Sequence, residues 1–483
     1  MEQNNLKKSA IANTIWKLME RFLAQGISFV VAIVIARILD PDDYSVVSIV
    51  TIFFTFANLL ISSGLNTALI QKKDADSEDY ATVFSISLVI SIVIYIALFF
   101  LAYPISRLYG KPVLVPIFHI MGLILPVDAL KSIVCAKVSS DLLFKKFFFA
   151  TLGGTLFSGI VGIVMAKIGY GAWALVAQQM INTIMDTVIL YILVPLRLKF
   201  FFSKKKFSRL FGYGWKIFVS SFIGTVYTEL NPLLIGLKFS SGDLAFYTKG
   251  RSFPGLVSSV STNTLAAVLF PVLSRKQDDK ELLLKYTRLY IRVASFMAFP
   301  LMIGLAVISD SFVAVLLTEK WLPAVPYIKI FCFAFMFDMI HIGNCETIKA
   351  MGRSDIYLLI EIIKKVGYFV TIGIFVFIAK SPLQLAMAYI VCTLIALIVN
   401  SIPNQVLLDY KLSSQLADII PNLFISLLMG IDVYFVGKLQ INTIVLLFIQ
   451  IVVGIIVYIL INVITKNQSF RYVCSSAKEF LKK

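Results

Sequence analysis

Residues 81–103 read ATVFSISLVISIVIYIALFFLAY and contain no charged side chain. An α-helix needs about 20 apolar residues to cross the hydrocarbon core of a bilayer. Similar runs recur along the 483-residue chain, which is 59% hydrophobic and 15% charged and has a mean hydropathy of +0.89. This composition excludes a soluble globular protein. Because the hydrophobicity is continuous rather than alternating, it also excludes a transmembrane β-barrel and predicts membrane-spanning helices.

Glycine, proline and charged residues divide the apolar sequence into segments of helical length. This punctuation predicts an all-α integral membrane protein with about fourteen transmembrane helices. The predicted spans are residues 14–37, 46–70, 81–103, 113–134, 147–167, 173–195, 217–237, 253–273, 293–317, 327–348, 357–379, 384–403, 422–437 and 443–464.

A weak internal repeat aligns residues 39–45 with 239–245, and 69–71 with 269–271. It predicts two pseudo-symmetric six-helix bundles in the same orientation, related by an axis along the membrane normal, with two further helices at the C-terminal end. The predicted divisions are an N-terminal bundle (1–196), a basic cytoplasmic linker (197–216), a C-terminal bundle (217–410), and the last two helices with a basic tail (411–483).

The chain carries 44 Lys and Arg against 27 Asp and Glu, a formal charge of +17. Since cytoplasmic loops of membrane proteins are enriched in Lys and Arg, this excess is expected without any nucleic-acid partner. The basic residues concentrate in alternate loops, above all in 197–216 and 275–292, which predicts that both termini lie in the cytoplasm. The basic C-terminal tail would then lie against the anionic inner leaflet.

The five cysteines form no C-x-x-C pair, and the two histidines, His119 and His341, are far apart in the sequence. This pattern predicts neither a disulfide framework nor a metal site, and it implies no cofactor. It also gives little support to an enzyme.

Ionisable and amide side chains near the centre of a span are costly, so they usually face a cavity or a partner. Span 217–237 carries Tyr227, Glu229 and Asn231, and span 327–348 carries Asp338 and His341 one turn apart. These residues are candidates for a substrate cavity, with Glu229, Asp338 and His341 as candidates for ion coupling. Hydrogen bonding between helices is the alternative.

Two helical faces carry polar residues at i, i+4 and i+8. They are Asn58, Ser62 and Asn66 in one span and Gln178, Asn182 and Asp186 in another. Both stripes are candidate polar cavity linings, and helix packing explains them equally well.

Basic residues at span ends could surround a cavity mouth and attract a phosphate or an acidic sugar. The candidates are Lys17 and Arg21, with Glu20 between them as a further ion-coupling candidate, and Arg37, Lys249 and Arg251. Snorkelling into the headgroups is the alternative for any single one of them, and equally for Lys131, Lys329, Lys364 and Lys365.

Five segments, in order, resemble the Wzx-type polysaccharide flippases, in particular the colanic acid and teichuronic acid exporter branch of the multidrug/oligosaccharidyl-lipid/polysaccharide (MOP) superfamily. They are ARILDPDDY (36–44), LIQK (69–72), FPVLSR (270–275), EKWLPA (319–324) and MGRSD (351–355). The family usually has Gly where this chain has Asp40 and Ser45, and often has Gly at the position of Thr318.

The resemblance implies alternating access by two bundles that move an undecaprenyl-diphosphate-linked oligosaccharide from the cytoplasmic to the outer leaflet of a bacterial plasma (inner) membrane. Lipids and, in the cell, a polysaccharide polymerase and a chain-length regulator are the implied partners. We expect Lys17, Arg21, Lys249 and Arg251 to engage the diphosphate, while the polar stripes bind the sugars. The alternatives are a multidrug or cation antiporter of the same superfamily and a membrane polysaccharide polymerase or scaffold.

Overall fold

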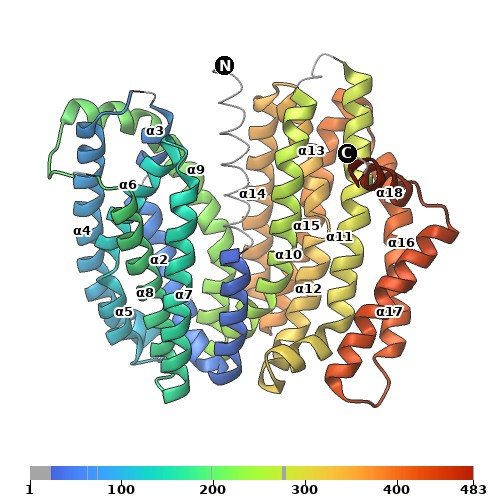
Figure 1. The fold of residues 1–483 in the computed structure, drawn as a ribbon, viewed down its shortest axis with the longest axis horizontal. Coiled ribbons are helices and arrows are strands. Elements are labelled where there is room, and N and C mark those ends of the chain that lie inside the picture. The colour runs from blue at the N-terminus through green and yellow to red at the C-terminus, as the bar shows by residue number, and fades with distance from the viewer. Residues whose placement is uncertain (1–22, 63, 73, 197, 275–278, 482–483) are drawn as a thin grey trace. The chain divides into compact units, whose positions relative to one another are not determined.

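The computed structural model describes residues 23–62, 64–72, 74–196, 198–274 and 279–481 (Figure 1). Within these ranges the chain forms helices joined by short turns and contains no strand. It divides into two compact units, Met1–Ala245 (unit 1) and Phe246–Lys483 (unit 2).

Unit 1 is a bundle in which α7 packs along α8, and α9 packs against α2, α3 and α4. Its helices are Leu23–Ile38, α2 (Pro41–Ser62), α3 (Leu65–Gln71), α4 (Ser77–Tyr109), α5 (Leu114–Gly122), α6 (Leu125–Ser140), α7 (Phe144–Ile168), α8 (Ala172–Leu193) and α9 (Lys204–Lys238). The next helix, α10 (Ser241–Ser274), begins in unit 1 and continues into unit 2.

Unit 2 is built around α11, which contacts α12, α13, α16 and α17. Figure 1 shows α18 running crosswise to the long helices of this unit. The elements after α10 are α11 (Lys280–Leu316), the 3-10 helix η1 (Glu319–Ala324), α12 (Val325–Phe335), α13 (Asp338–Ala350), α14 (Ser354–Ile378), α15 (Pro382–Leu408), α16 (Leu412–Val436), α17 (Thr443–Ile464) and α18 (Gln468–Leu481).

The all-helical membrane fold is confirmed. In the described ranges nine helical segments are long and apolar enough to cross a membrane, and the bent pair α5 and α6 would make a tenth. The predicted spans at 217–237, 253–273 and 357–379 are helical too, as α9, α10 and α14, but contain more polar residues. The expected count of fourteen is consistent with these helices.

The two aligned turns of the internal repeat have the same cap. The Asp43 Oδ2 atom accepts a hydrogen bond from the Asp40 N–H at 3.2 Å, and the Asp243 Oδ2 atom accepts one from the Ser240 N–H at 3.1 Å. Each carboxylate thereby holds the start of the helix that follows. Ser45, a departure from the family pattern, is fully buried and accepts a hydrogen bond from Lys111 Nζ at 2.9 Å.

A shared carboxylate ties α11 to α16 in unit 2. Arg288 Nε and Arg292 Nε both donate to Asp418, at 2.8 and 2.9 Å, and Tyr410 Oη donates to the same group at 2.7 Å. A nearly buried carboxylate is stable only with such partners, because desolvating its charge is costly.

Thr318 is held in a backbone conformation that favours glycine. Its φ and ψ are 83° and 166°, just before η1 and the fully buried Trp321. A side chain in this region crowds the backbone, which is a physical reason for the Gly that the family resemblance leads one to expect here.

We expect Thr318→Gly to raise the free energy of unfolding by about 1 kcal/mol, since relief of about 1–3 kcal/mol of strain exceeds the added chain entropy of about 0.5–1 kcal/mol. Thermal unfolding of the purified protein in detergent measures the change. Thr318→Ala keeps the Cβ and is the control, for which no comparable gain is expected. A lower melting temperature for the glycine variant would contradict the assignment of strain.

Candidate functional site

In each unit a span is interrupted beside an aspartate. In unit 1, α5 and α6 meet at a bend of 41°. In unit 2, a turn at residues 336–337 separates α12 from α13. Asp128 lies in the first turn of α6, and Asp338 lies in the first turn of α13. Helix N-termini carry partial positive charge, so each carboxylate is placed where its helix stabilises it. Interrupted helices are typical of binding sites in membrane transporters.

Asp128 belongs to a cluster of charges inside unit 1. Lys131 Nζ lies 2.9 Å from Asp186 Oδ2 and forms an ion pair between α6 and α8. Lys131 also acts on Asp128, to which Asn58 of α2 hydrogen-bonds. Two carboxylates therefore share one ammonium group, and we call Asp128, Lys131 and Asp186 the Lys131 cluster. In a low-dielectric interior such an excess of negative charge favours a bound cation or proton.

Gly154 of α7 makes room for this cluster. A Cβ atom at Gly154 would come within 1.9 Å of Asp186 Oδ1. That oxygen is buried and accepts no hydrogen bond from the described residues. The missing side chain at Gly154 thus allows α7 to approach α8 without displacing the carboxylate.

Asp338 lies among polar and cationic groups of unit 2. Ser258 Oγ of α10 donates a hydrogen bond to Asp338 Oδ2 at 2.7 Å. The charges of Arg251 and Lys364 also act on this carboxylate. Asp338 is therefore partnered by a hydroxyl group and two more distant cations, whereas Asp186 forms a direct ion pair.

His341 starts a row of buried amides. Asn400 Nδ2 of α15 donates to His341 Nδ1 at 3.0 Å, which leaves the proton of a neutral imidazole on Nε2. One turn further along α13, Asn344 donates to Gln415 Oε1 at 2.9 Å and accepts from Asn404 Nδ2 at 2.7 Å. The row links α13 to α15 and α16. This arrangement favours a structural role for its amides.

The first polar stripe does not lie on one continuous helix. The span predicted at 46–70 is interrupted, because α2 ends at Ser62 and α3 begins at Leu65 after Gly64, whose φ is 67°. Asn66 therefore belongs to a different helix from Asn58 and Ser62, and the prediction of a single face at i, i+4 and i+8 is wrong here. The Ser62 hydroxyl bonds back to the Leu59 carbonyl at 3.1 Å, which leaves the exposed Asn58 as the member that reaches the Lys131 cluster.

The second stripe faces the neighbouring helix α7. Asn182 Nδ2 donates to Ser158 Oγ at 3.3 Å, and a Cβ atom at Gly162 would come within 3.0 Å of the Gln178 side chain. These contacts correspond to the helix-packing alternative for this stripe.

The cationic candidates are dispersed along the chain. Lys17 and Arg21, with Glu20, lie outside the described residues, and Arg37 is exposed. In unit 2 the Lys249 ammonium lies 5.6 Å from the centre of the Trp321 ring, and the Arg251 guanidinium lies 5.8 Å from that of Tyr389. Cation–π contacts of this kind stabilise each cation against its aromatic ring.

The remaining candidates lie on α9. Tyr227 and Glu229 are half-buried, whereas Asn231 is only 1% exposed. Neither amide atom of Asn231 has a hydrogen-bond partner among the described residues. A buried unpaired amide costs about 1–3 kcal/mol, so a polar ligand at this position would be stabilised.

Sequence reasoning missed Asp128 and treated Lys131 as a side chain that snorkels. In the structure Lys131 pairs with Asp186 instead. The signal was present in the sequence, since Asp128 and Lys131 stand at i and i+3 within an apolar run and so face the same side of a helix.

Comparison with known proteins gives the family context. A family profile described as "Polysaccharide biosynthesis protein" matches residues 34–326. The chain is 25% identical over 488 residues to an uncharacterized membrane protein in the cps region of Klebsiella pneumoniae, covering 96% of both chains. It is 22% identical over 362 residues to the lipopolysaccharide biosynthesis protein WzxC of Escherichia coli (strain K12), covering 74% of each. Among solved structures, the lipid II flippase MurJ in an inward closed conformation has the same fold, with a TM-score of 0.74 and 15% identity over 94% of this chain and 98% of that one.

We expect Gly154→Ala to lower the free energy of unfolding by about 3 kcal/mol, because the new methyl group would displace Asp186 from Lys131 and leave a charge unpaired. Thermal unfolding in detergent measures the loss. Gly373→Ala on α14, where a Cβ atom meets nothing within 4 Å, is the matched control. Equal melting temperatures for the two variants would show that the ion pair does not depend on the space at Gly154.

Proposed function

The chain belongs to the polysaccharide biosynthesis protein family, and we propose that it flips a lipid-linked oligosaccharide from the cytoplasmic to the outer leaflet of a bacterial plasma membrane. The observation that carries this proposal is a fold shared with a lipid II flippase over 94% of the chain, in a member of this family. Both termini are placed in the cytoplasm, as the distribution of Lys and Arg predicts.

The substrate we infer is an undecaprenyl-diphosphate-linked repeat unit of a capsular, O-antigen, exopolysaccharide or teichuronic-acid-like polymer. Lys249 and Arg251, placed against aromatic rings, support a site for the diphosphate, to which Lys17, Arg21 and Arg37 are assigned by the same proposal. One guanidinium group can donate two parallel hydrogen bonds to two oxygens of the same phosphate. A polymerase and a chain-length regulator would receive the flipped unit.

Sugar recognition is assigned to polar side chains of the candidate site. The unpaired amide of Asn231 is the best supported of them, with Tyr227 one turn away on α9. The proposal retains Asn58, Ser62, Asn66, Gln178 and Asn182 as weaker candidates, because the contacts of Ser62 and Asn182 are within or between helices.

Transport by alternating access requires a source of free energy. Outward movement of two negative charges is favoured by an inside-negative potential, worth about 2.3 kcal/mol per charge per 100 mV. Ion coupling is assigned to Asp338 with His341, and to Glu20 and Glu229. The Lys131 cluster adds Asp128 as a further carboxylate at a helix interruption.

The proposal is tested by depleting the protein from its native host and locating the lipid-linked repeat units. Intact units protected from an external glycosidase would establish a block at flipping. Units that reach the outer leaflet but stay unpolymerised would indicate a polymerase or a scaffold instead. Unchanged repeat units together with increased drug sensitivity would indicate an antiporter.

We expect Asn231→Leu to abolish most export while leaving the melting temperature unchanged or higher, because it removes an amide that has no hydrogen-bond partner in the part of the chain that the structure describes. The export of surface polymer and thermal unfolding are measured on the same variant. Asn344→Leu is the matched control and should lose about 1–3 kcal/mol of stability, since its amide is bonded to Gln415 and Asn404. Normal export by Asn231→Leu would remove Asn231 from the substrate site.

We expect Arg251→Ala to reduce export severely and Arg251→Lys to retain part of it, because a lysine keeps the positive charge but loses the paired donors. Export is compared at equal amounts of protein in the membrane. Full export by Arg251→Ala would contradict its assignment to the diphosphate.

A further inference from the structure

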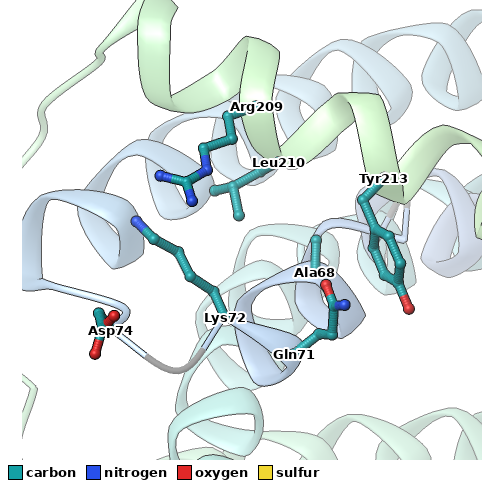
Figure 2. Close-up of a pocket in the computed structure, with 7 residues that line it drawn as sticks. All are labelled: Ala68, Gln71, Lys72, Asp74, Arg209, Leu210 and Tyr213. Atoms are coloured by element: carbon teal, nitrogen blue, oxygen red, sulfur yellow. The ribbon is translucent and has the colours of Figure 1, made fainter.

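A pocket of about 540 Å³ lies in unit 1 where α9 crosses the end of α3. This volume is within the range of about 300–1,000 Å³ typical of ligand sites. Figure 2 shows the lining side chains, which come from α3, from the loop after it and from the first turns of α9. They are Ala68, Gln71, Lys72, Asp74, Arg209, Leu210 and Tyr213.

A close backbone contact creates this pocket. Gly64 has a positive φ of 67°, and a Cβ atom there would come within 2.2 Å of the Gly214 carbonyl oxygen. The absence of side chains at Gly64 and Gly214 lets α9 lie directly on the start of α3. Leu210, 4% exposed, then packs in the same core cluster as Ala68. Arg209 and Tyr213 are left at the sides of the pocket.

The carboxylates along the start of α4 already have cationic partners. Lys72 forms an ion pair with the buried Asp79. Lys206 lies 2.6 Å from Asp76 and 2.8 Å from Glu78. The hydrogen bond from Lys206 lowers the pKa of Asp76 to about 2, so this carboxylate is ionised at neutral pH. These ion pairs hold Lys72 and Lys206 in position. The three carboxylates that they engage, Asp76, Glu78 and Asp79, therefore already have cationic partners other than Arg209.

Arg209 is the lining cation that is available to a ligand. Its side chain is exposed, and no hydrogen bond or ion pair with the described residues engages its guanidinium. In Figure 2 the Arg209 and Lys72 side chains point toward one another, while Asp74 lies beyond Lys72, away from Arg209. Two cationic groups converge on one side of the pocket, with the Gln71 amide on its other side.

Exposed aromatic side chains stand on both sides of Arg209 in the sequence. Phe200 is 72% exposed, Phe202 53%, Phe211 43% and Trp215 44%. In the same stretch stand Lys204, Lys205 and Lys206. A mixture of aromatic and basic residues is typical of the level of the lipid headgroups, where rings contact acyl chains and cations contact phosphates.

We propose that this pocket binds the phosphate headgroup of an anionic phospholipid, with Arg209 as the phosphate ligand. Arg209 would bind two phosphate oxygens through its fork of donors, and the Lys72 ammonium group, which is ion-paired with Asp79, would lie beside the phosphate. The acyl chains would lie against the exposed rings of residues 200–215. This site is separate from the flipping of a substrate and does not depend on the proposed function.

The test uses the purified full-length protein in neutral detergent, titrated with phosphatidylglycerol or phosphatidylcholine and examined by native mass spectrometry. We expect preferential binding of phosphatidylglycerol, weakened by about tenfold in Arg209→Gln, the size of effect that loss of one charge-assisted hydrogen bond produces. Arg209→Lys should bind with intermediate affinity.

Lys205→Gln is the matched control, because it removes the same charge from an exposed position of α9 outside the pocket. It should bind phosphatidylglycerol like the wild type. Equal weakening by both variants would overturn the proposal in favour of a diffuse basic surface, as would equal binding of both lipids by the wild type. Binding of a polyprenyl diphosphate without binding of phosphatidylglycerol would also overturn it. Thermal unfolding verifies that each variant is folded.

Discussion

A polar group inside a bilayer has no water to bind, so it must find its partner within the protein. This constraint explains where the charges of this chain are placed. Lys131 pairs with Asp186, two arginines share Asp418, and Asp338 accepts from Ser258. Each interaction joins helices that are distant in sequence, so the same contacts that neutralise a charge also fix the packing of the bundle.

The positions of the helices could be predicted from the sequence because the hydrophobic signal is local. A run such as residues 81–103 has no alternative to a membrane helix. The interruptions at Gly64 and at residues 336–337 were not predicted, since both lie within apolar sequence. The first depends on a positive φ at Gly64 and on its contact with Gly214, which lies on a helix far along the chain. A contact between two distant glycines produces no recognisable spacing pattern in the sequence.

The candidate site was only partly predictable for the same reason. The polar residues of spans were identifiable one by one, and Asp338 and His341 do start α13 with polar partners. The sequence did not reveal which of these side chains contact one another in the folded protein. Asn182 could have faced a cavity, but it contacts Ser158 of α7. Among the described residues Asn231 has no hydrogen-bond partner, which is also a property of the fold and separates this amide from the row that begins at His341.

The two spans that are interrupted beside Asp128 and Asp338 have a further consequence, which concerns the history of the chain. Asp128 is followed three residues later by a lysine, and Asp338 is followed three residues later by a histidine. If the halves descend from one duplicated ancestor, the acid has been kept in both copies while the base has changed in one. A lysine amine in an ion pair stays protonated, whereas an imidazole can donate and accept a proton. The copies are therefore no longer interchangeable, and a chain assembled from two first halves would duplicate the ion pair and lose the imidazole.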